Sequence, residues 1–87
     1  MKYVVIYETA PDAAAKLAEY FPAHRAEWQH YQDDGTLIAI GPFADRSGAM
    51  SVFATREAAE AFVHGDPFVI HGAIKNWTIR EWNEALL

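Results

Sequence analysis

Two residues that lie far apart in the 87-residue sequence, His24 and Asp66, could together form an acid–base pair. An imidazole exchanges protons near neutral pH, and a carboxylate can fix its tautomer and stabilise its charged form. Asp66 precedes Pro67, which disfavours the α conformation at Asp66, so the helix that carries Ala58, Ala59, Phe62 and Val63 should end by Asp66. The sequence therefore predicts a carboxylate at a helix end, where it either caps the next segment or holds a nearby cation.

Both residues also have structural interpretations. His24 falls in an apolar stripe, as a core histidine that hydrogen-bonds to a backbone carbonyl would. Asp66, followed by Pro67, fits the N-cap of a short turn over residues 67–70. The two roles of Asp66 are compatible, because one carboxylate oxygen can cap while the other orients an imidazole.

Four further residues are candidates for substrate binding. Gly41 and Pro42 end a predicted strand, where backbone can approach a ligand closely, although Gly-Pro is also ordinary in turns. Ser47 lies in the following loop and has no G-x-S-x-G setting, so we do not expect it to be a nucleophile. Phe68 follows the helix break at Asp66. We expect these four residues to contact the substrate of the His24 and Asp66 pair.

The remaining histidines do not predict a metal site. His24 and His30 lie six residues apart, which separates them by about 120° around a helix. His64 and His71 could cluster with Asp66, but this spacing matches no common ligand pattern. We expect no metal and no other cofactor.

The elements that must position these residues follow from the apolar pattern. Strands are predicted at residues 2–8, 36–40, 50–54 and 73–82, with helices between the first two and between the last two. Helix-start chemistry is given by Thr9, Pro11 and Asp12 for the first helix, and Thr55 is a candidate N-cap for the second. Pro22 should bend or divide the first helix. The apolar stripe of that helix contains Leu17, Tyr20 or Phe21, His24, Trp28 and Tyr31.

The resulting βαββαβ order predicts a ferredoxin-like α+β fold, in which a four-stranded antiparallel sheet carries two helices on one face. We expect one domain over residues 1–87. In the last strand, Trp77 and Ile79 should share one face, and Ile74 and Trp82 the other. The sheet face without helices would lie bare, and a second subunit packed sheet on sheet would cover it.

Composition supports association and excludes several classes of protein. The chain is 52% hydrophobic and 14% aromatic, whereas a domain of this size buries only about 60 to 65% of its surface. It has no cysteine, which excludes disulfides and thiolate sites. Its net charge of −5 argues against nucleic-acid binding. No apolar stretch is long enough for a membrane span, and no signal peptide opens the chain, so we expect a cytoplasmic protein.

The order and spacing of these features resemble the YCII-related (YciI-like) family over nearly the whole chain. The resemblance is carried by the helical His24, Gly41-Pro42 at a strand end, Gly48 opening the third strand, Asp66-Pro67-Phe68, and Gly72 before the last strand. It implies a homodimeric α/β barrel of ferredoxin-like subunits, with an active site built on His24 and Asp66. Many relatives carry an arginine three positions before the histidine, where this chain has Phe21, and Arg25 points about 100° away around the helix.

The resemblance also implies similarity to muconolactone isomerases and a link to dehydrochlorination of chlorinated hydroxyhydroquinones. The favoured hypothesis is an enzyme in which His24 moves a proton on a small cyclic or aromatic substrate while Asp66 orients it, in an isomerisation or elimination. The alternative is a non-catalytic small-molecule-binding or regulatory module. RNA-recognition motifs share the βαββαβ order and display aromatic and basic residues on the open face of the sheet. The predicted third strand, residues 48–54, has one phenylalanine and no positive charge, which argues against RNA binding.

Overall fold

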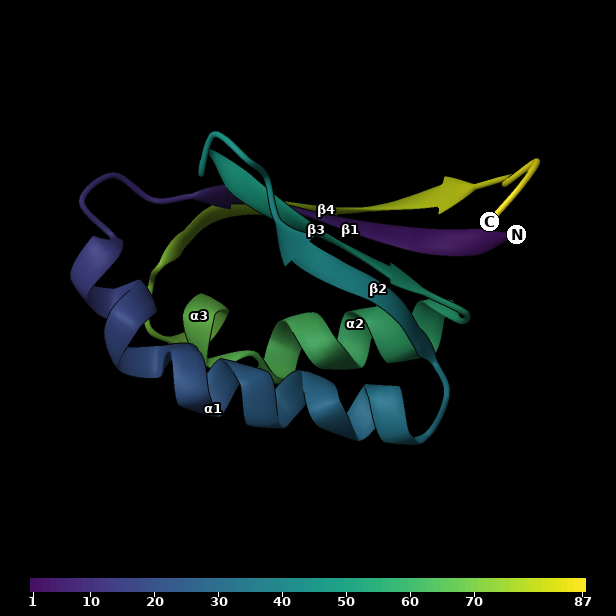
Figure 1. Cartoon of the computed structure of the whole chain (residues 1–87), viewed down its shortest axis with the longest axis horizontal. Coiled ribbons are helices and arrows are strands. Elements are labelled where there is room, and N and C mark those ends of the chain that lie inside the picture. Colours follow the sequence, from purple (N-terminus) through teal and green to yellow (C-terminus); the bar gives the residue numbers. More distant parts are fainter.

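The computed structural model describes residues 1–87. The elements in chain order are β1 (Lys2–Thr9), α1 (Ala14–Asp33), β2 (Leu37–Pro42), β3 (Gly48–Phe53), α2 (Arg56–Gly65), α3 (Pro67–Ile70) and β4 (Ile74–Trp82) (Figure 1). This confirms the predicted βαββαβ order, with the short helix α3 at the position of the predicted turn.

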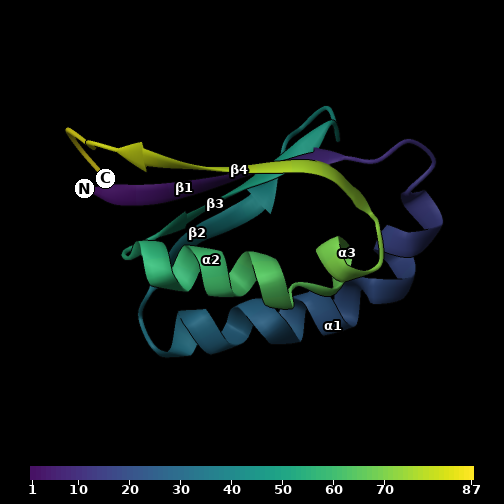
Figure 2. The ribbon, with the colours of Figure 1, turned by 180° about the vertical axis from the view of Figure 1, so that it is seen from behind.

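The four strands form one antiparallel sheet in the order β2-β3-β1-β4. Both long helices and α3 cover the same face of this sheet, as Figure 2 shows from behind. The ferredoxin-like fold is therefore confirmed. The N-terminal strand β1 lies in the interior of the sheet, beside β3 and β4, so its inward side chains face the helices from the centre of the fold.

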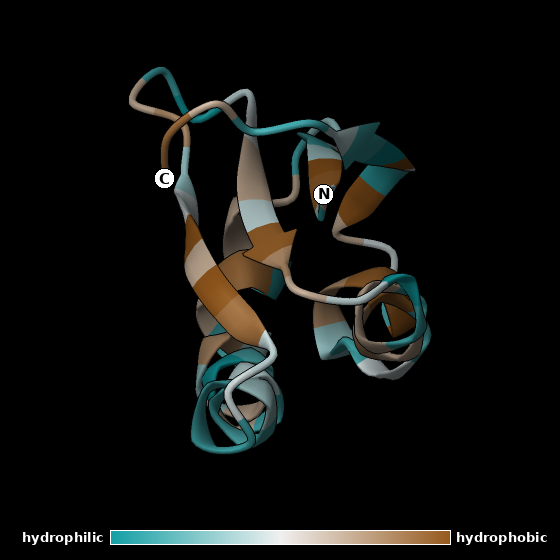
Figure 3. Ribbon diagram, turned by 90° about the vertical axis from the view of Figure 1, so that its right-hand side faces the viewer, coloured by the Kyte–Doolittle hydropathy of each residue, from teal (hydrophilic) through white to brown (hydrophobic).

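The main core lies between the central strands and α2. It contains Val5, Tyr7, Leu37, Phe53, Ala58, Ala59, Phe62 and Val63. Figure 3, which looks along the helices, shows two of them side by side against the sheet, with apolar residues concentrated on the strands. Thr55 begins α2 as predicted, since its side chain accepts a hydrogen bond from the backbone N–H of Ala58 at 3.1 Å.

Helix α1 differs from its prediction at two positions. It continues through Pro22 as one helix of 20 residues, so division into two segments is wrong, and its first turns are inclined to the rest (Figures 1 and 2). Its N-cap is Ala13, which makes no side-chain hydrogen bond. Asp12 has a left-handed backbone with φ of 58° and belongs to the preceding turn. It therefore does not cap the helix.

The predicted face of Ile74 is wrong. The pairing of β1 with β4 shifts register between Glu8 and Thr9, which places Ile74 opposite Thr9. Ile74 then packs on the helix side, against the small cluster of Ala13, Phe68 and Ala73. A bulge inserts one residue into the alternation, so residues on its two sides exchange faces.

The opposite face of the sheet carries no helix (Figure 1). Ile6, Met50 and Trp82 lie on this face by their strand pairings, and the side chains of Met50 and Trp82 are 41% and 38% exposed. None of the helices is both long enough and apolar enough to span a membrane.

Candidate active site

Asp66 lies at the junction of α2 and α3, and local chemistry places it there. Its backbone is extended, with φ of −72° and ψ of 120°, as the following Pro67 requires. It ends α2 and serves as the N-cap of α3. Asp66 is 0% exposed, so its carboxylate depends entirely on protein groups for hydrogen bonds.

Three donors satisfy the Asp66 carboxylate. Its Oδ1 atom accepts the backbone N–H of Phe68 at 3.1 Å and lies 2.8 Å from Nδ1 of His24. Its Oδ2 atom accepts the hydroxyl of Tyr7 at 2.8 Å. Asp66 thus both caps α3 and contacts His24, as expected. Oδ1 makes both of these contacts, while Oδ2 accepts the hydrogen bond from Tyr7.

His24 is the one buried residue of α1, and its orientation is fixed on two sides. Its ring stacks on Phe68 with centroids 4.0 Å apart and planes inclined by 13°. Because Asp66 accepts from its other neighbours, Nδ1 of His24 is best assigned as the protonated nitrogen that donates to Asp66. Nε2 makes no hydrogen bond within the chain, so it is the nitrogen left for proton exchange.

Tyr7 is the member of this network that the sequence analysis missed. Burial raises the pKa of its phenol well above the ordinary value, and the adjacent charge of Asp66 and their hydrogen bond raise it further. Tyr7 therefore stays protonated and acts as a donor. A buried tyrosine needs a hydrogen-bond partner for its hydroxyl, so the inward position of Tyr7 in β1 could have indicated that such a partner exists. The sequence does not identify that partner, because Asp66 lies 59 residues away.

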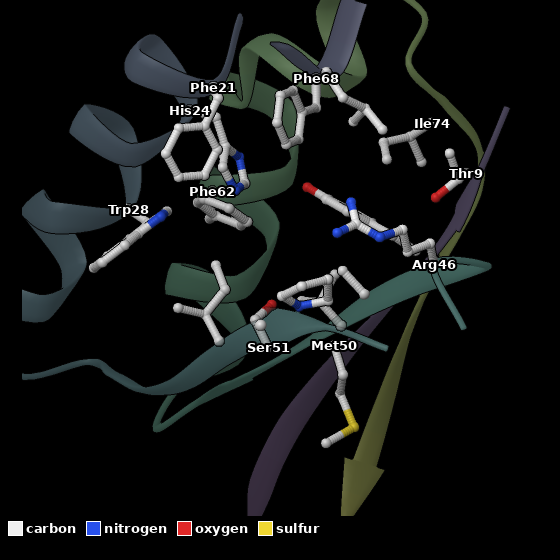
Figure 4. Close-up of a pocket in the computed structure, with 18 residues that line it drawn as sticks. Thr9, Phe21, His24, Trp28, Arg46, Met50, Ser51, Phe62, Phe68 and Ile74 are labelled. Carbon is white, nitrogen blue, oxygen red and sulfur yellow. The ribbon is translucent and has the colours of Figure 1, made fainter. Parts of the chain in front are cut away.

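A cavity of about 420 Å³ opens beside this network, between α1 and the sheet (Figure 4). Hydrophobic residues make up 11 of the 18 that line it, and His24 and the hydroxyl-bearing Tyr7 line it too. Figure 4 shows His24 at one wall of the cavity, close to Phe21 and Phe68. A volume in the lower part of the range for small-molecule sites suits a compact ligand.

The structure brings most of the predicted site residues together. His24, Gly41, Pro42 and Phe68 line the cavity, and Asp66 lies behind His24 without lining it. Ser47 does not line it: its hydroxyl donates to Asp45 at 2.7 Å in an exposed turn. Because that hydroxyl is engaged at the surface, the structure gives Ser47 no contact with a ligand in the cavity.

Phe21, at the position where many relatives carry an arginine, lines the cavity and is half exposed. A different arginine, Arg46, reaches the cavity from the loop between β2 and β3 (Figure 4). The sequence does not mark Arg46 as a cavity residue, because nothing in the local pattern of a turn indicates which side chain points inward.

The other histidines have separate surroundings. The ring of His71 stacks on Tyr20 with centroids 4.0 Å apart. The rings of His64 and Trp77 are nearly perpendicular, with centroids 5.7 Å apart. No group of three or more potential ligands among histidine and carboxylate side chains comes together in the chain.

Comparison with known proteins gives the chain its family. A model of the YCII-related domain matches residues 1–83. The chain belongs to this family. Protein YciI of Escherichia coli O6:H1 is 27% identical to this YCII-related chain over 96 aligned positions, which cover 97% of the chain and 98% of that protein.

Two solved structures share the fold of this YCII-related protein. The 5-chloro-2-hydroxyhydroquinone dehydrochlorinase of Burkholderia phenoliruptrix, in complex with 2,5-dihydroxybenzoquinone, matches with a TM-score of 0.81 and 17% identity, over 98% of this chain and 96% of that one. Rv0793 of Mycobacterium tuberculosis matches with a TM-score of 0.51 and 14% identity, over 98% and 97%. At these identities the likeness establishes the fold alone.

Proposed function

We propose that this protein is a small acid–base enzyme in which His24 moves a proton on a compact cyclic or aromatic substrate. One observation carries the proposal: His24 lines an apolar cavity while a fully buried carboxylate, Asp66, holds its Nδ1 atom at 2.8 Å. A core histidine needs only one satisfied hydrogen bond. The unpartnered Nε2 atom beside a cavity is what a general base requires in addition.

The chemistry proposed is isomerisation or elimination. In a dehydrochlorination, the ring carbon that bears chlorine first takes up a proton while a neighbouring hydroxyl loses its own and becomes a carbonyl. Nε2 of His24 then takes the proton of a second hydroxyl, whose electron pair forms another carbonyl and shifts the ring double bond, and chloride leaves with its bonding pair to give a hydroxyquinone. The imidazolium then returns the proton to solvent, so the net change is loss of HCl. Asp66 stabilises the imidazolium while it exists, and Tyr7 and Phe68 keep Asp66 in place.

The fold shared with a dehydrochlorinase supports this choice of first substrate, 5-chloro-2-hydroxyhydroquinone. The 420 Å³ cavity is large enough for a single substituted ring, and its aromatic walls suit a planar one. The residues present include no cysteine and no serine set against a base, so proton transfer fits them better than nucleophilic hydrolysis.

The test is release of chloride from 5-chloro-2-hydroxyhydroquinone, measured with the purified protein and three variants. His24→Ala should lower kcat by about 10² to 10⁴-fold, the usual contribution of a positioned base. Asp66→Asn should also lower it strongly, because an amide has one acceptor oxygen and cannot accept from all three donors. His30→Ala, an exposed histidine on the same helix, is the matched control and should leave the rate unchanged.

The non-catalytic alternative gives a different result. If the protein binds ring compounds in the cavity without converting any of them, it is a binding module. Equal turnover by wild type and His24→Ala would show that the pair is structural and would overturn the proposed role of His24.

We also propose that a second copy of this chain covers the bare face of the sheet. The support is the exposed apolar surface of Met50 and Trp82 around a buried centre that includes Val4 and Val52. Monomeric proteins rarely expose a contiguous apolar patch larger than a few hundred Å². Packing of two such sheets would enclose these side chains in a homodimer.

A further inference from the structure

Arg46 provides the one fixed charge among the residues that line the cavity. The other lining residues are apolar or neutral polar, apart from His24, and the Asp66 carboxylate is fully buried behind it. Thr9, Leu17, Phe21 and Arg46 also line a second hollow at the surface, which places Arg46 where the cavity opens. Figure 4 shows its side chain extending into the cavity toward the region of His24 and Phe62.

The guanidinium of Arg46 has no carboxylate partner. No acidic oxygen lies within 4 Å of it, and it makes no hydrogen bond within the chain. The acid beside it in sequence, Asp45, is occupied: it accepts the backbone N–H of Ser47 at 2.9 Å and the Ser47 hydroxyl at 2.7 Å. Ser47, predicted as a ligand contact, instead donates both of these hydrogen bonds to Asp45.

The backbone of the hairpin aims Arg46 at the cavity. Its φ of 62° is left-handed, a conformation that glycine adopts freely and other residues adopt at a cost. Two hydrogen bonds hold the turn, from Arg46 N–H to the carbonyl of Phe43 at 2.9 Å and from Thr9 N–H to the carbonyl of Ser47 at 2.9 Å. A strained arginine with a free charge at a cavity mouth is a candidate for ligand binding.

We propose that Arg46 binds an anionic oxygen of the substrate, so that the cavity selects small ring compounds with a carboxylate or phenolate over neutral ones. This rests on the proposed site but not on turnover. An anion at Arg46 would place the ring against the apolar walls, with its far edge toward His24. Ser51, a buried residue of β3 whose hydroxyl makes no hydrogen bond in the chain, lines the same cavity and is available to a second polar substituent.

The test compares the binding of benzoate and benzamide, which have nearly the same shape but differ in charge. Dissociation constants are measured by NMR titration at a pH of about 8.5, where an ordinary imidazole is neutral. Wild type should bind benzoate about fivefold or more tightly than benzamide, as expected for an ion pair at a rim. Arg46→Gln should bring the two affinities within about twofold, and benzamide binding should not change.

Arg25→Gln is the matched control. It removes the same charge from an exposed residue next to His24 that does not line the cavity. It should keep the preference for benzoate. Equal loss of preference in both variants would mean that net charge alone acts, and would overturn the proposal, as would equal binding of the two probes or binding of neither by wild type.

The proposed turnover and the proposed anion binding by Arg46 can each be disproved without the other. Selective binding of benzoate without chloride release from the chlorinated substrate would overturn the proposed enzyme while supporting Arg46. Chloride release that is unaffected by Arg46→Gln, with no preference for benzoate, would support the proposed enzyme and overturn the proposed role of Arg46.

Discussion

At the scale of single residues, Tyr7 is the part of the Asp66 network whose effect can be measured separately from His24. It donates to Oδ2, whereas His24 and the α3 backbone use Oδ1. Tyr7→Phe leaves Oδ2 buried without a donor, which should cost about 1 to 3 kcal/mol of unfolding free energy near pH 8. Urea unfolding gives this quantity, and Tyr3→Phe, on the same strand but without a hydrogen bond from its hydroxyl, should change it little.

The difference in unfolding free energy between wild type and Tyr7→Phe should also depend on pH in the alkaline range. Burial, then the charge of Asp66, raises the pKa of Tyr7 in the folded protein, while an unfolded tyrosine ionises near pH 10. The stability that this proton contributes is complete below about pH 10 and falls above it by up to about 1.4 kcal/mol per pH unit. The stability advantage of wild type over Tyr7→Phe should therefore shrink by about 1 kcal/mol between about pH 10 and pH 11. A constant difference between the two proteins over that range would contradict a buried, protonated Tyr7.

At the scale of elements, the contact between β1 and β3 depends on Gly48. A side chain there would overlap the backbone carbonyl of Tyr7 in the neighbouring strand, and neither backbone can move without breaking the ladder. Gly48→Ala should therefore destabilise the protein by about 3 kcal/mol or more. Because β1 carries Tyr7 into the site, the loss of this pairing also disturbs the network around Asp66.

Gly41→Ala is the control for that prediction. A Cβ atom at Gly41, one strand away, meets nothing within 4 Å. This variant should be neutral or slightly more stable, by up to about 1 kcal/mol, because alanine has less freedom to lose on folding. Thermal or urea unfolding of the two variants would test this. Equal stability of both variants would show that the strands separate more easily than the structure indicates.

Elements whose boundaries depend on nearby residues could be predicted from the sequence. Thr55 caps α2 through a neighbour three positions away, and Asp66 caps α3 through one two positions away. The site residues that could not be predicted depend on distant partners. Tyr7 meets Asp66 across 59 residues, and the inward direction of Arg46 depends on a turn held by Thr9. The face of Ile74 was wrong because a register shift leaves no mark in the alternation of apolar residues.

At the scale of the whole molecule, the proposed homodimer predicts that a charge at one surface residue, Met50, changes the mass of the assembly in solution. The side chain of Met50 points away from the cavity and lies 41% exposed on the bare face of the sheet (Figure 4). A lysine there would leave a charge buried between two packed sheets, which is strongly unfavourable. Sedimentation velocity should give twice the chain mass for wild type and the single-chain mass for Met50→Lys at micromolar concentration. Leu86→Lys, 89% exposed in the C-terminal tail, should remain a dimer. A wild-type protein that sediments as a monomer throughout this range would exclude the sheet-on-sheet homodimer.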